Sequence, residues 1–178
     1  MKNIDKIRRA SRRLRYLLIA IAWILPLINA LMWSIVNSLP EDITSRMLPH
    51  FVNLPLPLQA RALGFVTTMI PTCIAICGLF YLMRLFELYE KGQIFSSANV
   101  RCFRNLSRVL IVWSGVGIVY RALLGVALTL HHPPGQRILS LSLGSPDLTA
   151  LLLGGILAVI AWVMEEGQRL QEDQELTV

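Results

Sequence analysis

The sequence predicts an all-α integral membrane protein, a four-helix bundle with both termini in the cytoplasm. Of its 178 residues, 54% are hydrophobic and 16% are charged, which gives more apolar surface than a soluble core of this size can bury. The charged residues also concentrate between four long apolar runs, and the runs themselves hold almost none. We therefore interpret the runs as spans of a single membrane domain.

The first span follows a basic segment, which is also typical of a signal peptide. Its apolar run is longer than the ~7 to 15 residues of a signal peptide, and no small-residue cleavage site follows it, so we expect a retained span. A helix rises ~1.5 Å per residue, so about 20 residues cross a hydrocarbon core of ~30 Å. The fourth run is shorter, but Ser145 as N-cap, Pro146 and Asp147 make a favourable helix start. The expected spans cover about residues 16–36, 62–83, 109–130 and 146–164.

The distribution of Lys and Arg predicts the orientation of the chain. Seven lie in the N-terminal segment, five in the connection between the second and third spans, and one in the C-terminal tail, against three in the other two connections. Because cytoplasmic segments carry the excess of basic residues, thirteen against three predicts cytoplasmic termini in a bacterial inner (plasma) membrane. Aromatic residues fall near the span ends, as in the aromatic belts of membrane proteins: Tyr16, Trp33, Tyr81, Trp113 and Trp162.

The cytoplasmic side is expected to be the more ordered one. Residues 87–91 can continue the second helix, Gly92 suits its C-terminal cap, and Ser96 or Ser97 can cap the third helix. The second and third helices should therefore project into the cytoplasm and turn between Gly92 and Phe95. Residues 165–178 hold five acidic residues and one Arg, and form an acidic cytoplasmic tail.

Arg121 is the charge that lies near the middle of a span. Such a charge is costly in lipid, and Gly117 and Gly125 on the same helical stripe favour a position inside the bundle. Its function could be to bind an anionic ligand or to sense the membrane environment; the interpretation we favour is an arginine that holds helices together. The side chains expected within its reach are Asn29, Thr67, Thr68 and Asp147.

Other residues with metal or redox chemistry give weaker signals. Cys73 and Cys77 share a helix face without a His or carboxylate in the same span, and are better explained as small packing residues. Three histidines could form a zinc site on the outer side, but no carboxylate cluster accompanies them, so we expect neither a metal nor a cofactor. Pro26 and Pro71 are expected to bend their spans. The histidines are His50, His131 and His132.

The net charge of +6 lies beside the spans, so the bilayer with its anionic headgroups is a more plausible partner than nucleic acid. No nucleotide-binding loop, zinc-protease motif or nucleophile elbow is present in the sequence, and we do not expect an enzyme.

Two segments, 87–100 and 162–178, resemble a bacterial membrane family filed as domain of unknown function 2975. The resemblance implies four spans and no established activity, and it supplies no catalytic residue. Members are often encoded beside small helix-turn-helix regulators, which implies a membrane sensor or regulator that binds such a transcription factor.

The leading hypothesis is therefore a signalling protein that regulates transcription through its cytoplasmic face. The alternative is a small transporter or toxin-immunity protein with a site around Arg121. The third is a purely structural or assembly subunit. As a further partner, the chain could bind copies of itself in a homo-oligomer. The candidate partner face comprises Tyr89, Gly92, Phe95, Asn99, Glu165, Glu166, Glu172, Asp173 and Glu175.

Overall fold

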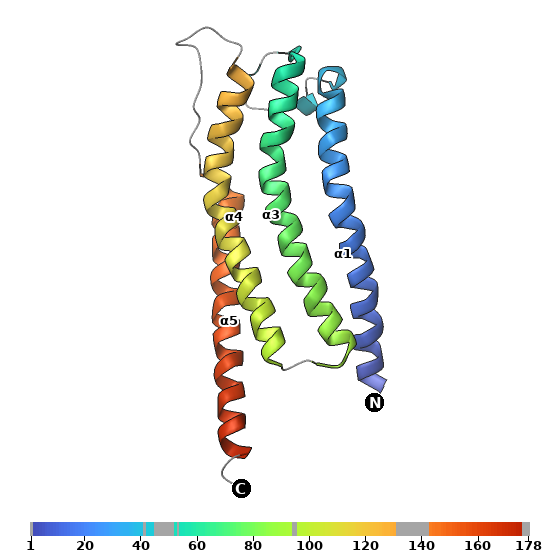
Figure 1. Cartoon of the computed structure of the whole chain (residues 1–178), viewed down its shortest axis with the longest axis vertical. Coiled ribbons are helices and arrows are strands. Elements are labelled where there is room, and N and C mark those ends of the chain that lie inside the picture. Colours follow the sequence, from blue (N-terminus) through green and yellow to red (C-terminus); the bar gives the residue numbers. More distant parts are fainter. Residues whose placement is uncertain are drawn as a thin grey trace.

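The protein is all-helical over the part of the chain that the computed structural model describes, and no strand occurs there. The described residues are 2–40, 42–44, 52, 54–93, 96–130 and 143–175. The elements are α1 (Lys2–Ile35), η1 (Val36–Ser38), α3 (Leu58–Glu90), α4 (Ser97–Thr129) and α5 (Ser145–Glu175) (Figure 1).

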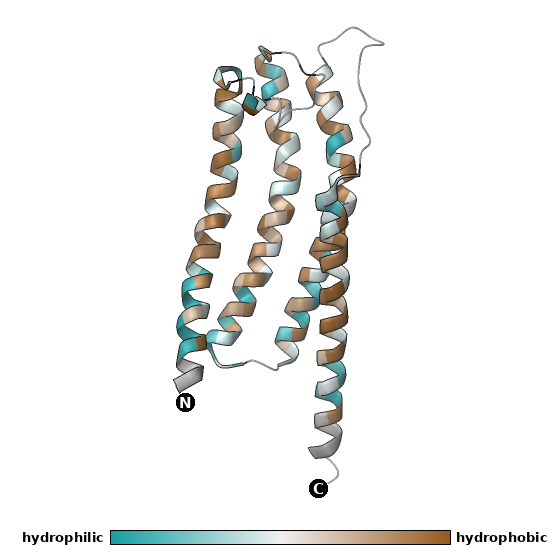
Figure 2. Ribbon diagram, turned by 180° about the vertical axis from the view of Figure 1, so that it is seen from behind, coloured by the Kyte–Doolittle hydropathy of each residue, from teal (hydrophilic) through white to brown (hydrophobic). Residues whose placement is uncertain are grey.

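Within the described residues, four helices are long and apolar enough to cross a membrane, which confirms the predicted number of spans. Each contains 31 to 34 residues, or roughly 46 to 51 Å of helix, so each extends well past a hydrocarbon core of ~30 Å. Hydrophilic residues gather where both termini and the α3–α4 turn lie together (Figure 2). We call this part, with residues 6–15, 84–104 and 165–175, the charged end.

Three of the helices, α1, α3 and α4, lie side by side, and α5 packs against α4 (Figures 1 and 2). Extensive packing joins α1 to α3, α3 to α4 and α4 to α5, and α3 lies between α1 and α4 in both views (Figures 1 and 2). No comparable packing joins α1 to α5 in the described ranges. Their outer faces expose large apolar residues such as Trp23 and Trp162. Because lipid tails are as apolar as these side chains, burial of the faces against each other gains little.

A glycine opposite a large side chain sets the distance between α1 and α3. Trp33 lies directly over Gly64, and a Cβ at that position would overlap its indole ring. Its Nε1 donates a hydrogen bond to the hydroxyl of Thr68 at 2.9 Å. Trp33 is only 3% exposed, so the prediction that it belongs to an aromatic belt is wrong. A partner on the next helix satisfies the indole N–H, and the ring packs in the core.

The end opposite to the charged end is held by polar contacts to the backbone. Arg61 donates from Nε to the carbonyl of Trp33 at 2.9 Å and also to the carbonyl of Ser34, which satisfies the last turn of α1. Asn37 donates its side-chain amide to the carbonyl of Leu56 at 3.0 Å, and its side-chain oxygen accepts the N–H of Leu56 at 2.9 Å. An apolar cluster joins three helices beneath these contacts and contains Trp33, Val36, Leu56, Ala60, Leu124 and Leu128.

The turn that joins α3 to α4 begins with the predicted glycine cap. Gly92 has a φ of 79°, and its N–H donates to the carbonyl of Tyr89 at 3.0 Å. The N–H of Gln93 donates to the carbonyl of Leu88 at 2.9 Å, which completes a Schellman motif. Ser96 occupies the N-cap of α4, although its hydroxyl makes no cap hydrogen bond. Phe95 lies outside the described residues.

The start of α5 differs by one residue from the prediction. The carbonyl of Gly144 accepts hydrogen bonds from the N–H groups of Asp147 and Leu148, at 3.0 and 3.4 Å. Gly144 is therefore the N-cap, and Ser145 is the first helical residue. The carboxylate of Asp147 accepts the N–H of Gly144 at 2.8 Å, so the cap contact comes from the third helical residue instead of from Ser145.

Two adjacent glycines of α5 allow a test of the α4–α5 contact. A Cβ on Gly154 would lie 3.0 Å from Ile111 and 3.2 Å from the carbonyl oxygen of Ser107, whereas a Cβ on Gly155 would meet nothing within 4 Å. Gly154→Leu should therefore destabilise the protein by about 1–3 kcal/mol through overpacking. Gly155→Leu is the matched control and should leave thermal unfolding in detergent unchanged or raise its midpoint. Equal midpoints for the two variants would contradict this packing.

Candidate functional site

An ion pair joins the third and fourth spans. Arg121, in the second half of α4, donates from its guanidinium to the carboxylate of Asp147, in the first turn of α5. Asp147 is 2% exposed, and the side chain of Arg121 is largely covered. The structure thus brings together two residues that the sequence places in one candidate site.

The carboxylate of Asp147 has three favourable interactions at this position. The carboxylate faces a cation, accepts the N–H of Gly144 and lies in the first turn of a helix, where the backbone dipole favours negative charge. Breaking such a pair would leave an uncompensated charge in a medium of low dielectric constant. The geometry therefore supports a structural role in which Arg121 anchors the start of α5 on α4.

Gly117 makes this ion pair possible. A Cβ at position 117 would overlap the carboxylate of Asp147, so only glycine lets α5 approach α4 here. A second contact follows about two turns further along α5, where Ser107 donates its hydroxyl to the carbonyl of Gly154 at 2.7 Å. Small residues thus hold α4 and α5 together at two separate levels.

A small pocket of about 110 Å³ lies beside the ion pair. Residues of α3, α4 and α5 line it, among them Pro71, Trp113, Tyr120, Arg121 and Asp147. A pocket of this size is below the ~300 Å³ that is usual for small-molecule sites. It has room for water or for a small ion.

The other predicted neighbours of Arg121 lie on a different interface. Asn29 of α1 accepts a hydrogen bond from the hydroxyl of Thr68 at 2.8 Å, and Thr68 also accepts from Trp33. Thr67 donates to the carbonyl of Leu63 in its own helix. Since α3 lies between α1 and α4, the predicted polar site divides into an α1–α3 group and an α4–α5 pair.

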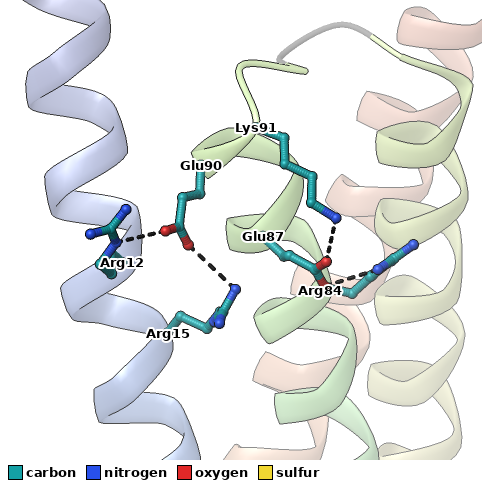
Figure 3. A network of polar contacts seen from close by, with 6 residues as sticks. All are labelled: Arg12, Arg15, Arg84, Glu87, Glu90 and Lys91. Carbon is teal, nitrogen blue, oxygen red and sulfur yellow. Dashed lines mark hydrogen bonds and ion pairs between the residues drawn. The ribbon is translucent and has the colours of Figure 1, made fainter.

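At the charged end, α1 is bound to α3 through Glu90 (Figure 3). Its carboxylate accepts from Nε of Arg12 at 2.6 Å and from Arg15 at 3.3 Å. The hydrogen bond to Glu90 raises the pKa of the Arg12 guanidinium above its ordinary value. These contacts span more than seventy residues of sequence, and no spacing rule reveals them.

Glu87 forms a second, local group on α3 (Figure 3). It binds Lys91 at 2.6 Å and Arg84 at 2.9 Å, at helical spacings of four and three residues. The hydrogen bonds from Lys91 and Arg84 hold the pKa of Glu87 below its usual range. This group could have been recognised from the sequence, because the i, i+4 spacing of Glu and Lys is a known helix-stabilising pattern.

Two predicted members of the partner face are directed inward. Asn99 is fully buried and donates its amide to the carbonyl of Gln93 at 2.7 Å, so it holds the α3–α4 turn. Tyr89 packs against a cluster of Leu85, Leu88 and Cys102. Burial raises the pKa of both the Tyr89 phenol and the Cys102 thiol. These side chains stabilise the hairpin.

The acidic members of the predicted face lie on α5. Glu165 receives a hydrogen bond from Arg104 of α4, which ties the two helices at the charged end. Glu166 is exposed. The backbone of α5 continues through Glu172, Asp173 and Glu175, whose side chains are outside the described part.

The remaining candidates stay apart from these groups. Cys73 and Cys77 are exposed on α3, and the described residues contain no group of three His, Cys, Asp or Glu side chains that could hold a metal ion. All three histidines of the predicted zinc site, at positions 50, 131 and 132, lie outside the described ranges.

Removal of one charge from the ion pair should cost more than removal of both. Asp147→Asn retains an acceptor for Gly144 but leaves Arg121 without its carboxylate, and should destabilise the protein by about 3–5 kcal/mol. The double variant Arg121→Leu with Asp147→Asn should be more stable than Asp147→Asn alone. The free energy of unfolding of both variants is measured by denaturant titration in detergent. Additive losses would show that the two residues do not stabilise each other.

Comparison with known proteins identifies the family and nothing finer. No curated protein and no solved structure matches the chain. A family model described as "Protein of unknown function (DUF2975)" matches residues 42–178, which contain α3, α4 and α5 with all the contacts of the α4–α5 interface. The matched region covers more than three quarters of the sequence, and the chain belongs to this family of proteins of unknown function.

Proposed function

We propose that the protein is a regulator in the bacterial inner membrane whose charged end faces the cytoplasm and binds a helix-turn-helix transcription factor. One observation carries the proposal: α5 continues as a helix through Glu175, and its C-terminal part extends beyond the other helices (Figure 1). This extension carries most of the acidic tail of the chain. It is an ordered, negatively charged element that a cytosolic protein can reach.

The distribution of charge supports this orientation. Both termini and the α3–α4 turn lie at the charged end, together with eleven of the seventeen basic residues. Basic residues beside spans are retained on the cytoplasmic side. The acidic extension of α5 then emerges into the cytoplasm past a basic membrane-proximal layer.

The rigidity of the charged end supports a binding role. The Schellman turn, the cluster of Leu85, Leu88 and Cys102, and the ion pairs of Glu90 fix α3 against its neighbours, and the ion pairs of Glu87 stabilise the last turns of α3. The pair of Arg104 with Glu165 fixes the point from which the extension leaves α4. A prearranged element loses less conformational entropy on binding than a free tail does.

The charge of the extension selects the class of partner. DNA-binding proteins carry a basic surface that binds phosphates, and an acidic helix complements it. The same acidic charge repels nucleic acid, so we propose no direct contact with DNA. The transcription factor would be held at the membrane with its basic surface covered by the extension. It would be released when the extension is displaced.

The test measures whether the detergent-solubilised full chain binds a helix-turn-helix transcription factor that is encoded beside its gene. Replacing four acidic residues of the extension (Glu166→Gln, Glu172→Gln, Asp173→Asn and Glu175→Gln) leaves the Arg104–Glu165 pair intact. Because charge steers the encounter, this variant should bind at least about tenfold more weakly. The matched control is Gln168→Ala, Gln171→Ala and Gln174→Ala, which retains every charge and should bind normally. Unchanged affinity for the first variant, or no binding by the native chain, would refute the proposal.

A second candidate is a transporter or toxin-immunity protein that works through the pocket beside Arg121. The observation in its favour is that two charged side chains line this pocket. Arg121 is bound to Asp147, however, so an anionic ligand would have to displace a carboxylate. Under this candidate, Arg121→Leu should abolish export or immunity while the tail variant stays active. The reverse result would favour the regulator.

A further inference from the structure

The seam between α1 and α3 contains an apolar groove of about 380 Å³. Ile19, Ala22, Trp23 and Pro26 line it from α1, with Phe80 and Met83 among those from α3. The volume lies within the range of about 300–1,000 Å³ that is usual for ligand sites. Trp23 is 73% exposed and Phe80 61%, so two large aromatic side chains stand at the groove without cover from the protein.

Arginines lie at one end of this groove. Ile19 follows Arg15 by one helical turn, or ~6 Å, and Met83 directly precedes Arg84. Arg12 and Arg15 belong to the same α1–α3 seam, because both reach Glu90 of α3. From this end the groove runs about 10 Å into the span, to Pro26. The site therefore combines a basic entrance with an apolar interior.

The arginines can bind a further anion while they hold Glu90. A guanidinium has five N–H donors, and Glu90 receives a hydrogen bond from one nitrogen of Arg12 and one of Arg15. The side chain of Arg12 is 63% exposed. Two guanidinium charges face one carboxylate here, which leaves a net positive charge at the entrance. Planar donors of this kind suit phosphate oxygens.

We propose that this groove is a binding site for an anionic phospholipid. The phosphate of the headgroup binds Arg12 and Arg15, and an acyl chain lies along Ala22, Trp23 and Phe80. Charge complementarity selects this occupant, since a zwitterionic lipid brings its own cation to a basic entrance, and a free phosphate leaves the apolar interior unfilled. The lipid would bridge α1 and α3 beside the Glu90 ion pairs. This site is independent of the proposed binding to a transcription factor.

The first experiment compares two lipids on the delipidated full chain in detergent. Phosphatidylglycerol and phosphatidylethanolamine with identical acyl chains are titrated, and bound lipid is counted by native mass spectrometry. A difference of one charge at a membrane surface should make phosphatidylglycerol bind roughly fivefold tighter. Equal affinities would overturn the proposal, and so would a dimer that lipid does not dissociate, because a second copy of the chain would then occupy the groove.

Variants of α1 separate a defined site from general attraction to positive charge. Arg12→Gln with Arg15→Gln should lower the affinity for phosphatidylglycerol roughly 30-fold, since two charges are lost. Arg9→Gln with Arg13→Gln removes the same charge from the same helix and should change the affinity less than threefold. Equal losses in the two variants would overturn the site.

Two further variants keep the test independent of folding defects. Glu90→Gln removes the competing carboxylate and should raise the affinity for phosphatidylglycerol roughly fivefold, a gain that misfolding cannot produce. Ala22→Trp fills the groove while leaving every charge in place, and should weaken binding of both lipids at least about fivefold, the loss expected when about 1 kcal/mol of acyl-chain burial is removed. Unchanged binding in either variant would contradict the assigned occupant.

Discussion

The ion pair between Arg121 and Asp147 is the contact on which the position of α5 depends. A lone arginine in the third span would be costly in lipid, and a lone aspartate at the start of the fourth would be equally so. Together, over Gly117, they form a neutral pair that also accepts the N–H of the helix cap. The pair therefore explains both why each charge is tolerated in an apolar run and why α5 begins where it does.

The other helix contacts also place a large or polar side chain of one helix against a glycine of the next. Trp33 rests on Gly64, Ser107 bonds to the backbone at Gly154, and Val109 packs on Gly78. In a membrane the hydrophobic effect does not drive helices together, so close approach at glycines and hydrogen bonds between helices determine the pairing. Each such contact joins a helix to its neighbour in the chain, and α1 and α5 share none in the described residues. These contacts pack each helix on its neighbours in the chain.

The sequence predicts the helices well because local features determine them: the length of each apolar run gives the span, and Gly92 gives the cap. The position of Arg121 inside an apolar run likewise indicates that it needs a partner within the protein. It does not predict which helix faces which. Asn29 was expected within reach of Arg121, but the position of a residue along its span cannot distinguish an adjacent helix from one beyond α3. The bond of Glu90 to Arg12 is equally hidden, since it depends on how α1 packs. Asn99 was assigned to the candidate partner face, yet its amide is needed inside the turn.

The carboxylates of the charged end divide into two classes, and the division locates the surface that remains for partners. Glu90 and Glu165 are bound to arginines of neighbouring helices and hold these helices together, and Glu87 is bound to Arg84 and Lys91 within α3. Beyond Glu165, α5 continues for ten more residues, or ~15 Å, and carries the other acidic residues of the tail. Helix α5 is packed extensively on α4 alone and is fixed at Asp147, Gly154 and Glu165. The three contacts therefore determine both the position of α5 on α4 and the point from which the acidic extension leaves α4.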